Sequence, residues 1–266
     1  MWAVNEKWRD PEARAQLRAT FEEVPDLYDR ARPTYPDELF RDLEEMAGLH
    51  PGSRVLEIGC GTGKATVSLA ERGYRITCVE LGAGLAAVAR RNVPNAEIVV
   101  ADFEDWTTDE RFDAIVAFSS FHWLDLSTAY ARCAALLKPS GVLATAGARH
   151  VLPRDGDPLF LEIQEDYRRF APEEKGEPPL PPEELPDWAD EIRASGAFAR
   201  VEVHRYVWDV VYGPQEYVDV IDTYSGHRVL PQEARARLYD SIRRRIEARG
   251  TIRKTYLAIL HAAFKE

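Results

Sequence analysis

Short apolar runs alternate with amphipathic stretches through the first two thirds of the chain. An apolar run bounded by turn residues is typical of a buried strand, whereas apolar positions spaced three or four apart indicate a helix. The runs predict strands at 54–58, 75–81, 97–101, 112–118 and 142–146, and the spaced positions predict helices at 65–72, 83–91 and 127–137. Because strands that alternate with helices of this length form βαβ units, we predict an α/β fold with a mostly parallel sheet and helices on both faces.

The segments before this core are helical with one interruption. Helices are predicted at 5–24 and 37–47. Between them, residues 28–36 hold two prolines and two tyrosines. Proline fixes φ and removes a backbone donor, so this segment is predicted to be an ordered loop.

After residue 150 the regular alternation stops. Residues 151–190 hold a cluster of prolines and many glutamates, with a helix predicted at 158–170. A strand is predicted at 201–211, helices at 214–224 and 232–249, and a closing strand at 255–263. The last segment also allows a helix, but its β-branched and aromatic residues and its apolar middle favour a strand buried on both faces.

These patterns predict a single domain over 1–266 with three additions to the sheet. We expect N-terminal helices and a cofactor-covering loop at 1–47, a helical cap or lid insertion at 151–190, and C-terminal helices at 214–249. A loop of this length that is rich in proline is more often a functional element than a simple connection. The sequence does not indicate an oligomeric state.

Composition and charge narrow the class of protein. Apolar residues make up 45% of the 266 positions and charged residues 30%, which is ordinary for a globular protein. The apolar runs are shorter than the roughly 20 residues that span a bilayer, so no membrane association is expected. The three cysteines form no CxxC pair and have no metal-ligand spacing, which favours reduced thiols in a cytoplasmic protein without a metal site.

The net charge of −11 argues against a nucleic-acid partner. A field of that sign repels phosphate backbones. The arginine triplet at 243–245 is interpreted as a solvated helix face, because such runs are usually that.

A glycine-rich turn follows the first strand of the core. Residues 55–64 read VLEIGCGTGK, so three glycines alternate between a buried strand and a helix. Glycines there permit a sharp turn and close approach of a ligand to the backbone. The spacing G-x-G-x-G differs from the G-x-G-x-x-G of nicotinamide enzymes, because position 64 is Lys, and it lacks the pattern of a phosphate-binding P-loop. An oxidoreductase is therefore disfavoured.

Glu80 ends the second strand, 80 − 59 = 21 positions after Gly59. In dinucleotide folds an acid about 20 residues past the glycines accepts hydrogen bonds from ribose hydroxyls. A solvated loop acid is the alternative, which the preceding glycine turn makes the less favoured one.

Several segments in order resemble the class I S-adenosylmethionine-dependent methyltransferases. They are EIGCGTG at 57–63, ADF at 101–103, FDAIV at 112–116 and LLKPSG at 136–141, where Ser140 replaces a common glycine. FHWLD at 121–125 and the loop at 28–35 resemble a bacterial small-molecule branch of that family. The resemblance covers residues 25–150 well and is weaker beyond. It implies a Rossmann-like, seven-stranded methyltransferase sheet and S-adenosylmethionine as cofactor.

The resemblance also implies roles for individual residues. Glu57 would orient the glycine turn or hold the cofactor's amino group through water, Glu80 would hold the ribose, and Asp102 and Phe103 would hold the adenine. Arg32 would pair either with the cofactor carboxylate or with a neighbouring acid. The expected cofactor-binding residues are Tyr28, Arg32, Glu57, Gly59, Gly61, Thr62, Gly63, Glu80, Leu81, Asp102, Phe103 and Ser119.

The expected acceptor is a small molecule. The residues expected to line its pocket are Tyr35, His122, Trp123, Tyr224 and His227. His122 follows the fourth strand at the carboxyl edge of the sheet, and it is either a general base or a group that orients the acceptor. A base is needed only if the nucleophile loses a proton, so a carboxylate acceptor would need none.

Two other functions remain open for this fold. A domain that binds S-adenosylmethionine without catalysis is one, because fold does not fix function. A nucleic-acid methyltransferase is the other. The segment Ser119–His122 lacks the Pro-Pro-aromatic motif of amino-methylating DNA enzymes, and none of the three cysteines follows a proline.

Overall fold

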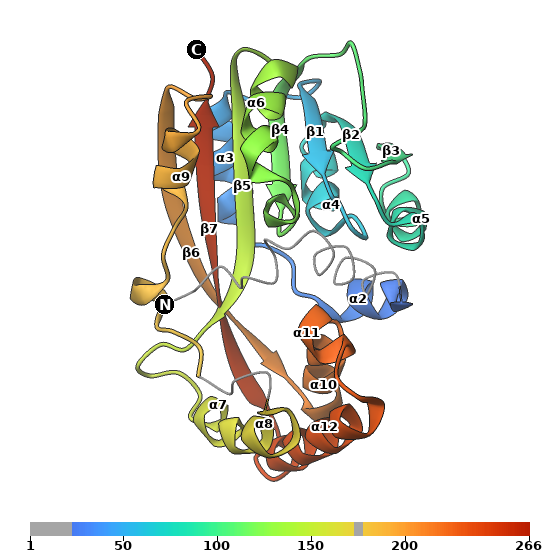
Figure 1. The fold of residues 1–266 in the computed structure, drawn as a ribbon, viewed down its shortest axis with the longest axis vertical. Coiled ribbons are helices and arrows are strands. Elements are labelled where there is room, and N and C mark those ends of the chain that lie inside the picture. Colours follow the sequence, from blue (N-terminus) through green and yellow to red (C-terminus); the bar gives the residue numbers. More distant parts are fainter. Residues whose placement is uncertain (1–22, 173–177) are drawn as a thin grey trace. The chain divides into compact units, whose positions relative to one another are not determined.

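The computed structural model describes residues 23–172 and 178–266, which contain a seven-stranded sheet (Figure 1). The sheet order is β3-β2-β1-β4-β5-β7-β6. The strands are β1 Arg54–Ile58, β2 Arg75–Glu80, β3 Glu97–Val100, β4 Phe112–Phe118, β5 Leu137–Val151, β6 Arg200–Tyr212 and β7 Ile252–Phe264. This mixed, mostly parallel sheet confirms the predicted Rossmann-like α/β fold.

The order of the strands reverses beside β1. The chain goes outward from β1 through β2 to β3, and then returns to β4 on the other side of β1, with all neighbours from β3 to β5 parallel. In open α/β sheets, ligands bind at such a switch point, outside the carboxyl ends of the strands. The glycine turn and the segment after β4 both lie at this edge.

The last strand in sequence runs against its neighbours. The N–H of Lys265, just after β7, donates to the carbonyl of Gly141 near the start of β5. The carbonyl of Phe264 accepts from Ala199, just before β6. The end of β7 therefore meets the starts of both neighbours, which makes it antiparallel to them.

The chain divides into two compact units. One comprises residues 34–148, 187–206 and 258–266, and is called the sheet unit below. The other comprises residues 1–33, 149–186 and 207–257, and is called the helical unit. The three segments expected to cover the site, at the N-terminus, at 151–190 and at 214–249, contribute most of the helical unit.

Helices pack on both faces of the sheet in the sheet unit. They are α3 Asp37–Ala47, α4 Lys64–Glu71, α5 Ala83–Asn92, α6 Leu126–Leu136 and α9 Ala189–Ala194, with a 3₁₀ turn, η3, at Phe121–Trp123. Figure 1 shows α6 and α9 on one face and α3 and α4 on the other. Under α6 and α9, residues such as Leu56, Ile115 and Leu143 share one buried cluster with Cys133 and Ile192.

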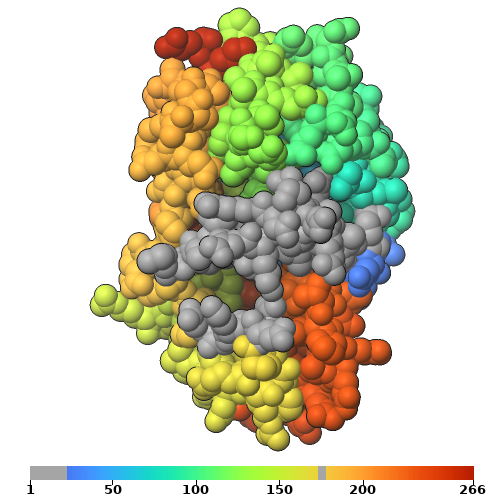
Figure 2. Space-filling model, in the orientation of Figure 1, coloured from blue at the N-terminus to red at the C-terminus, as the bar shows by residue number. Residues whose placement is uncertain are grey.

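The helical unit is held together by its longest helix. Its helices are α2 Pro25–Ala31, α7 Leu159–Glu162, α8 Gln164–Phe170, α10 Pro214–Asp222, α11 Ser225–Arg228 and α12 Gln232–Glu247, with a 3₁₀ turn, η5, at Pro182–Glu184. Helix α12 packs against both α10 and α8. In Figure 2, α8 (yellow) and α12 (orange-red) lie side by side at the surface. The apolar side of α12 is formed by Leu238, Ile242 and Ile246, which are fully buried.

Most of the predicted elements are present, and residues 255–263 do form a strand within β7. The prediction was wrong for residues 28–31, which form the last turn of α2 instead of a loop. Pro25 lies in the first turn of α2. Backbone N–H groups in that turn have no partner within the helix, so a proline there loses no hydrogen bond and can begin the helix. The predicted helix at 5–24 lies almost entirely outside the described residues.

Several other elements differ from the prediction. Strand β5 covers 137–151 instead of 142–146, and it includes Ser140 with a positive φ of 61° and an irregular register with β4. Residues 189–194 form α9, where no helix was predicted. The helix predicted at 214–224 ends at Asp222, and α11 follows it as a separate turn.

None of the helices in the described ranges is both long and apolar enough to cross a membrane.

Candidate cofactor and acceptor sites

The glycine turn joins β1 to α4 with three left-handed residues. The φ angles are 66° at Gly59, 58° at Gly61 and 87° at Gly63, a region that disfavours residues with a Cβ. At Gly59 the reason is also steric, because a Cβ would lie 2.6 Å from the Cβ of Ser120. The backbone at Gly59 therefore packs tightly against Ser120, in the segment after β4.

Thr62 supplies an unused polar group within this turn. Its side chain is fully buried, and its Oγ1 has no hydrogen-bond partner among the described residues. Its carbonyl accepts from the Asn92 side chain at 2.9 Å, which ties the turn to the end of α5. A buried hydroxyl without a partner is costly, so the turn has the chemistry of a site that a polar ligand completes.

Glu80 connects the glycine turn to the end of β2. One carboxylate oxygen accepts from the N–H of Gly61 at 2.8 Å, and the other accepts from the N–H of Gly82 at 2.8 Å. A carboxylate offers about four acceptor positions, so these two donors do not by themselves exhaust it. The residue predicted to bind the ribose thus also fixes the turn on which the cofactor would lie.

Glu57 lies inside β1 and supports the turn from within. Its side chain is 1% exposed and accepts a hydrogen bond of 2.7 Å from the hydroxyl of Thr66 in α4. The pKa of Glu57 is raised to about 7, mainly because the carboxyl group is buried. The Thr66 hydrogen bond lowers this pKa, and the nearby Glu80 carboxylate raises it. Of the two roles expected for Glu57, its hydrogen bond with Thr66 fits the one in which it orients the glycine turn.

The two residues expected at the adenine differ in exposure. Asp102 follows β3 and accepts the N–H of Glu104 at 3.0 Å, which fixes a local turn. The ring of Phe103 is 3% exposed and belongs to the core cluster, with the Arg132 guanidinium 5.1 Å from its centroid. Leu81, by contrast, is 45% exposed directly after Glu80, which is unusual for a leucine beside a buried strand end.

The segment after β4 brings the N-terminal loop to the same edge. Ser119 has a positive φ of 58°, and its hydroxyl is 2.7 Å from the hydroxyl of Tyr35. The Tyr35 ring packs on Phe118 with centroids 5.0 Å apart. Ser120 donates from its hydroxyl to the carbonyl of Ile58, immediately before the glycine turn. Ser119 and Tyr35, predicted from distant segments, therefore meet in the sheet unit.

His122 and Trp123 lie in η3, directly after this segment. Their rings are 4.9 Å apart at an angle of 40°, and both side chains are partly exposed. Asp125 then caps α6 by accepting from the N–H of Ser127. The imidazole is thus held at the carboxyl edge of the sheet by a rigid turn.

Four predicted site residues come together in the helical unit instead. The Arg32 guanidinium lies over the rings of Tyr28 and Tyr224, at 5.1 and 4.3 Å from their centroids. It donates to the hydroxyl of Thr223 at 2.7 Å and to its carbonyl at 3.1 Å. The ring of His227 lies 5.8 Å from that of Tyr224. No acid pairs with Arg32 in the described part of the chain.

Sequence reasoning missed Lys254, which also belongs to this group. It lies in β7 and is 1% exposed, and its Nζ lies 2.6 Å from the hydroxyl of Tyr224. The available signal was a lysine next to the apolar run at 256–260 of a strand that was expected to be buried on both faces. Fully buried lysines are rare unless they are paired.

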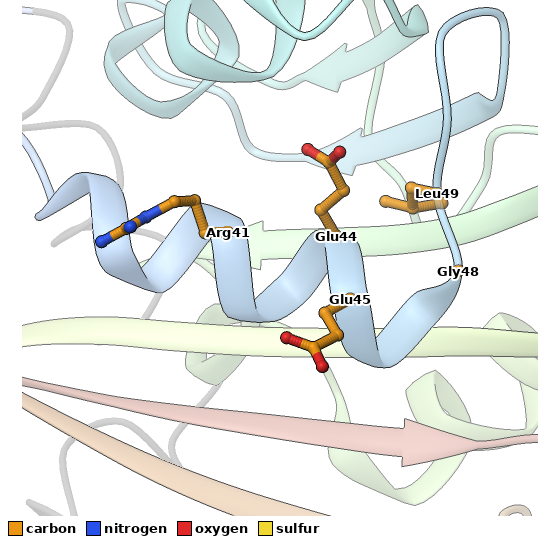
Figure 3. A pocket seen from close by; sticks show the side chains of 5 residues that line it. All are labelled: Arg41, Glu44, Glu45, Gly48 and Leu49. Carbon is orange, nitrogen blue, oxygen red and sulfur yellow. The ribbon is translucent and has the colours of Figure 1, made fainter.

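A cavity of about 380 Å³ opens elsewhere on the sheet unit (Figure 3). It is lined by Arg41, Glu44, Glu45, Gly48 and Leu49, all from α3 and the turn after it. Glu44 accepts from the hydroxyl of Tyr74 and lies near Arg72, so its carboxylate already has partners. None of the residues that line this cavity belongs to the glycine turn.

Known proteins with similar sequences and structures agree on one family. A methyltransferase-domain family matches residues 55–141, from β1 into β5. An uncharacterized methyltransferase of Mycobacterium tuberculosis is 25% identical over 244 residues, which cover 87% of each chain. A trans-aconitate 2-methyltransferase of Escherichia coli O157:H7 is 36% identical over 128 residues, 45% of this chain and 48% of that one.

A solved structure extends the likeness over most of the fold. A putative type II methyltransferase from Anaeromyxobacter dehalogenans superimposes with a TM-score of 0.64 at 22% identity, covering 88% of this chain and 97% of that chain. Together with the glycine turn and the acid after β2, these findings confirm the family predicted from the sequence. Residues 55–141 therefore form a methyltransferase domain on a Rossmann-like sheet, and the chain is an S-adenosylmethionine-dependent methyltransferase whose cofactor is S-adenosylmethionine.

Proposed function

We propose that this enzyme methylates a small-molecule acceptor in the cytoplasm by in-line displacement at the carboxyl edge of its sheet. The observation that carries the proposal is the glycine turn, which Glu80 holds in place at the strand-order reversal beside β1. The three buried, unpaired cysteines fit a reducing compartment.

The cofactor supplies a methyl group already activated on a sulfonium, so the chain supplies binding, alignment and exclusion of water. Glu80 would accept from the ribose hydroxyls, and the backbone of residues 59–63 would approach the methionine portion. Asp102 would accept from the adenine amine, with Leu81 as an apolar wall. Because the Phe103 ring is already enclosed, its position would contribute through the backbone.

A small acceptor is supported by the charge pattern of α12 and its neighbours. Each arginine of the triplet is within 4 Å of an acid: Arg243 and Arg244 of Asp240, and Arg245 of Asp166. A basic surface for a phosphate backbone needs positive charge that is not already neutralised. The trans-aconitate 2-methyltransferase shows, by its name, a small polycarboxylate as acceptor within the related proteins.

His122 would act on the acceptor and not on the cofactor. It would orient an acceptor that carries no proton to lose, or remove the proton from one that does. A rate that stays constant while His122 titrates would favour orientation, and a rate that falls as it becomes protonated would favour base catalysis.

Calorimetric titration of the purified chain with S-adenosylmethionine, S-adenosylhomocysteine and NADH tests the proposal. We expect micromolar binding of both adenosyl ligands and none of NADH. Glu80→Ala should weaken adenosyl binding by about tenfold or more, because hydrogen bonds to a charged group contribute roughly 1.5–3 kcal/mol. Glu97→Ala removes an exposed carboxylate in β3 and serves as the matched control.

Failure of the folded wild-type chain to bind either adenosyl ligand would overturn the proposal. Equal losses in Glu80→Ala and Glu97→Ala would remove Glu80 from the site. Tight cofactor binding without turnover of any small acceptor, or saturable binding to RNA or DNA, would contradict the proposed acceptor class.

A further inference from the structure

Lys254 is a buried cation that pairs with no carboxylate of the described residues. In the described ranges of the chain, its one hydrogen bond is to the Tyr224 hydroxyl, at 2.6 Å, and no ion pair reaches it. Burial lowers the pKa of Lys254, because the charged ammonium loses its hydration. A buried ammonium is unfavourable unless an anion compensates it, so a fold that keeps one needs a reason.

A second cation lies against the same tyrosine. Arg32 stacks 4.3 Å above the Tyr224 ring and donates only to Thr223 among the residues described. Asp222, the neighbour of Thr223 in the chain, is already used by Arg228, Arg235 and Tyr239. The chain as a whole is strongly acidic, yet among the described residues neither of these two cations pairs with an acid.

The aromatic surroundings compensate this charge only in part. The rings of Tyr217, Tyr224 and Tyr256 have centroids 5.4, 5.0 and 5.1 Å from Nζ of Lys254. Cation–π contacts stabilise a desolvated ammonium by less than the cost of removing it from water. Burial raises the pKa of Tyr224, but the Lys254 and Arg32 charges more than offset this and lower it overall.

His227 adds an unused nitrogen to the same group. Its Nε2 lies 3.1 Å from the Tyr167 hydroxyl, whereas its Nδ1 is buried without a partner among the described residues. Burial lowers the pKa of His227 to about 3, and the Lys254 charge lowers it further, so the ring is neutral. If the Tyr167 hydroxyl donates to Nε2, the proton lies on Nδ1 and is available to an acceptor atom.

We propose that Lys254, Arg32 and His227 bind a carboxylate of the methyl acceptor, which makes the acceptor a small carboxylic acid. The inference rests on the proposed function, and it deepens it by naming the acceptor class. A carboxylate accepts from several donors at once and supplies the charge that the two cations lack. All three side chains lie in the helical unit: Arg32 directly follows α2, His227 lies in α11 and Lys254 lies in β7.

Binding measurements at saturating S-adenosylhomocysteine test this inference. The probes are trans-aconitate, citrate, malonate and inorganic phosphate, titrated by calorimetry into wild type, Lys254→Met and Arg253→Met. We expect at least one carboxylate to bind wild type and to lose tenfold or more in affinity in Lys254→Met, because a desolvated charge pair is lost. Arg253 is exposed in the same strand and pairs with Asp209, so Arg253→Met should bind as wild type does.

Three results would overturn the inference. They are carboxylate binding that is equal in Lys254→Met and wild type or absent from both, a preference for phosphate over every carboxylate, and a loss of S-adenosylhomocysteine affinity in Lys254→Met. The last would assign the cations to the cofactor's own carboxylate. If wild type did not bind S-adenosylhomocysteine at all, the proposed function would fail instead, which is a separate result.

Thermal unfolding without ligand separates binding from a structural role. Lys254→Met removes an uncompensated buried charge and fills a similar volume, so its melting temperature should rise above that of wild type. Tyr224 keeps Tyr256 as a hydrogen-bond partner in this variant. A lysine retained for stability would instead lower the melting temperature when replaced.

Discussion

Glu57 is a carboxyl group placed where ionisation is unfavourable. It lies inside β1, accepts from Thr66 and faces the charge of Glu80. Burial is the main reason that its pKa is raised to about 7. The protonated form therefore fits the fold better than the carboxylate, and in the absence of cofactor the stability of the chain depends on pH through this residue.

Replacing Glu57 with Gln tests this dependence. A raised pKa means that the stabilising effect is complete below pH 4.5, the ordinary value for Glu, and is lost as pH rises through about 7. Glu57→Gln should match wild type near pH 4.5 and exceed its free energy of unfolding by up to about 3 kcal/mol at pH 8. Urea denaturation of the two proteins across this range measures the difference.

A matched control makes that comparison specific. Glu110→Gln removes an exposed carboxylate that pairs with Arg54. Its free energy of unfolding shows the effect of replacing a surface glutamate by glutamine. A difference between Glu57→Gln and wild type that stays constant from pH 4.5 to 8 would contradict the account of Glu57 given above.

The contact between α8 and α12 depends on one buried carboxylate. Asp166 is in the first turn of α8, where a negative charge is favourable. It accepts from the Ser241 hydroxyl at 2.8 Å and lies 2.7 Å from Nε of Arg245. The same arginine also pairs with Glu165, but that side chain is 72% exposed. The two acids that pair with Arg245 therefore differ mainly in burial.

Alanine substitutions at the two acids should therefore have unequal effects. Asp166→Ala leaves Ser241 and Arg245 without their buried acceptor and should lower the free energy of unfolding by about 1–3 kcal/mol. Glu165→Ala removes an exposed ion pair and should change it by no more than about 0.5 kcal/mol. Denaturant unfolding of both variants at neutral pH gives the comparison, and equal losses would show that burial does not decide the strength of this contact.

At the scale of the whole molecule, the two units share three strands. The division falls inside β5, β6 and β7, after residues 148, 206 and 257. Neither unit keeps these strands intact if the other unfolds, so cooperative loss of both is favoured over stepwise unfolding.

Calorimetry should show one unfolding transition for the whole chain. S-adenosylhomocysteine, which is expected to bind the sheet unit, should raise its midpoint, with a stabilisation of about 2.7 kcal/mol at a hundredfold excess over Kd. Asp166→Ala, in the helical unit, should lower the midpoint of that same transition. Two transitions, one responding to the ligand and the other to the substitution, would show that the units unfold independently.

The sheet core and its chemistry could be predicted from the sequence alone. The strand and helix patterns from 54 to 146, the glycine turn and Glu80 are local features, because backbone conformation and βαβ connection depend on residues close together in the chain. The start of α2 was not predicted, because proline occurs both in the first turn of a helix and just after the end of one. The local sequence does not distinguish these two cases. The strand at 255–263 was ambiguous, because a short apolar run fits either element.

Which distant side chains meet depends on how the chain packs in three dimensions, and the sequence did not predict it. Tyr35 contacts Ser119, while Arg32, Tyr224 and His227 gather around Lys254, and Phe103 lies enclosed in the core. The sequence signal for Lys254, a lysine beside the apolar run at 256–260, does not by itself indicate a site, since such a lysine is ordinarily solvated. Its importance arises from burial and from the lack of an acid nearby in the described chain, and both depend on how segments more than a hundred residues apart pack together.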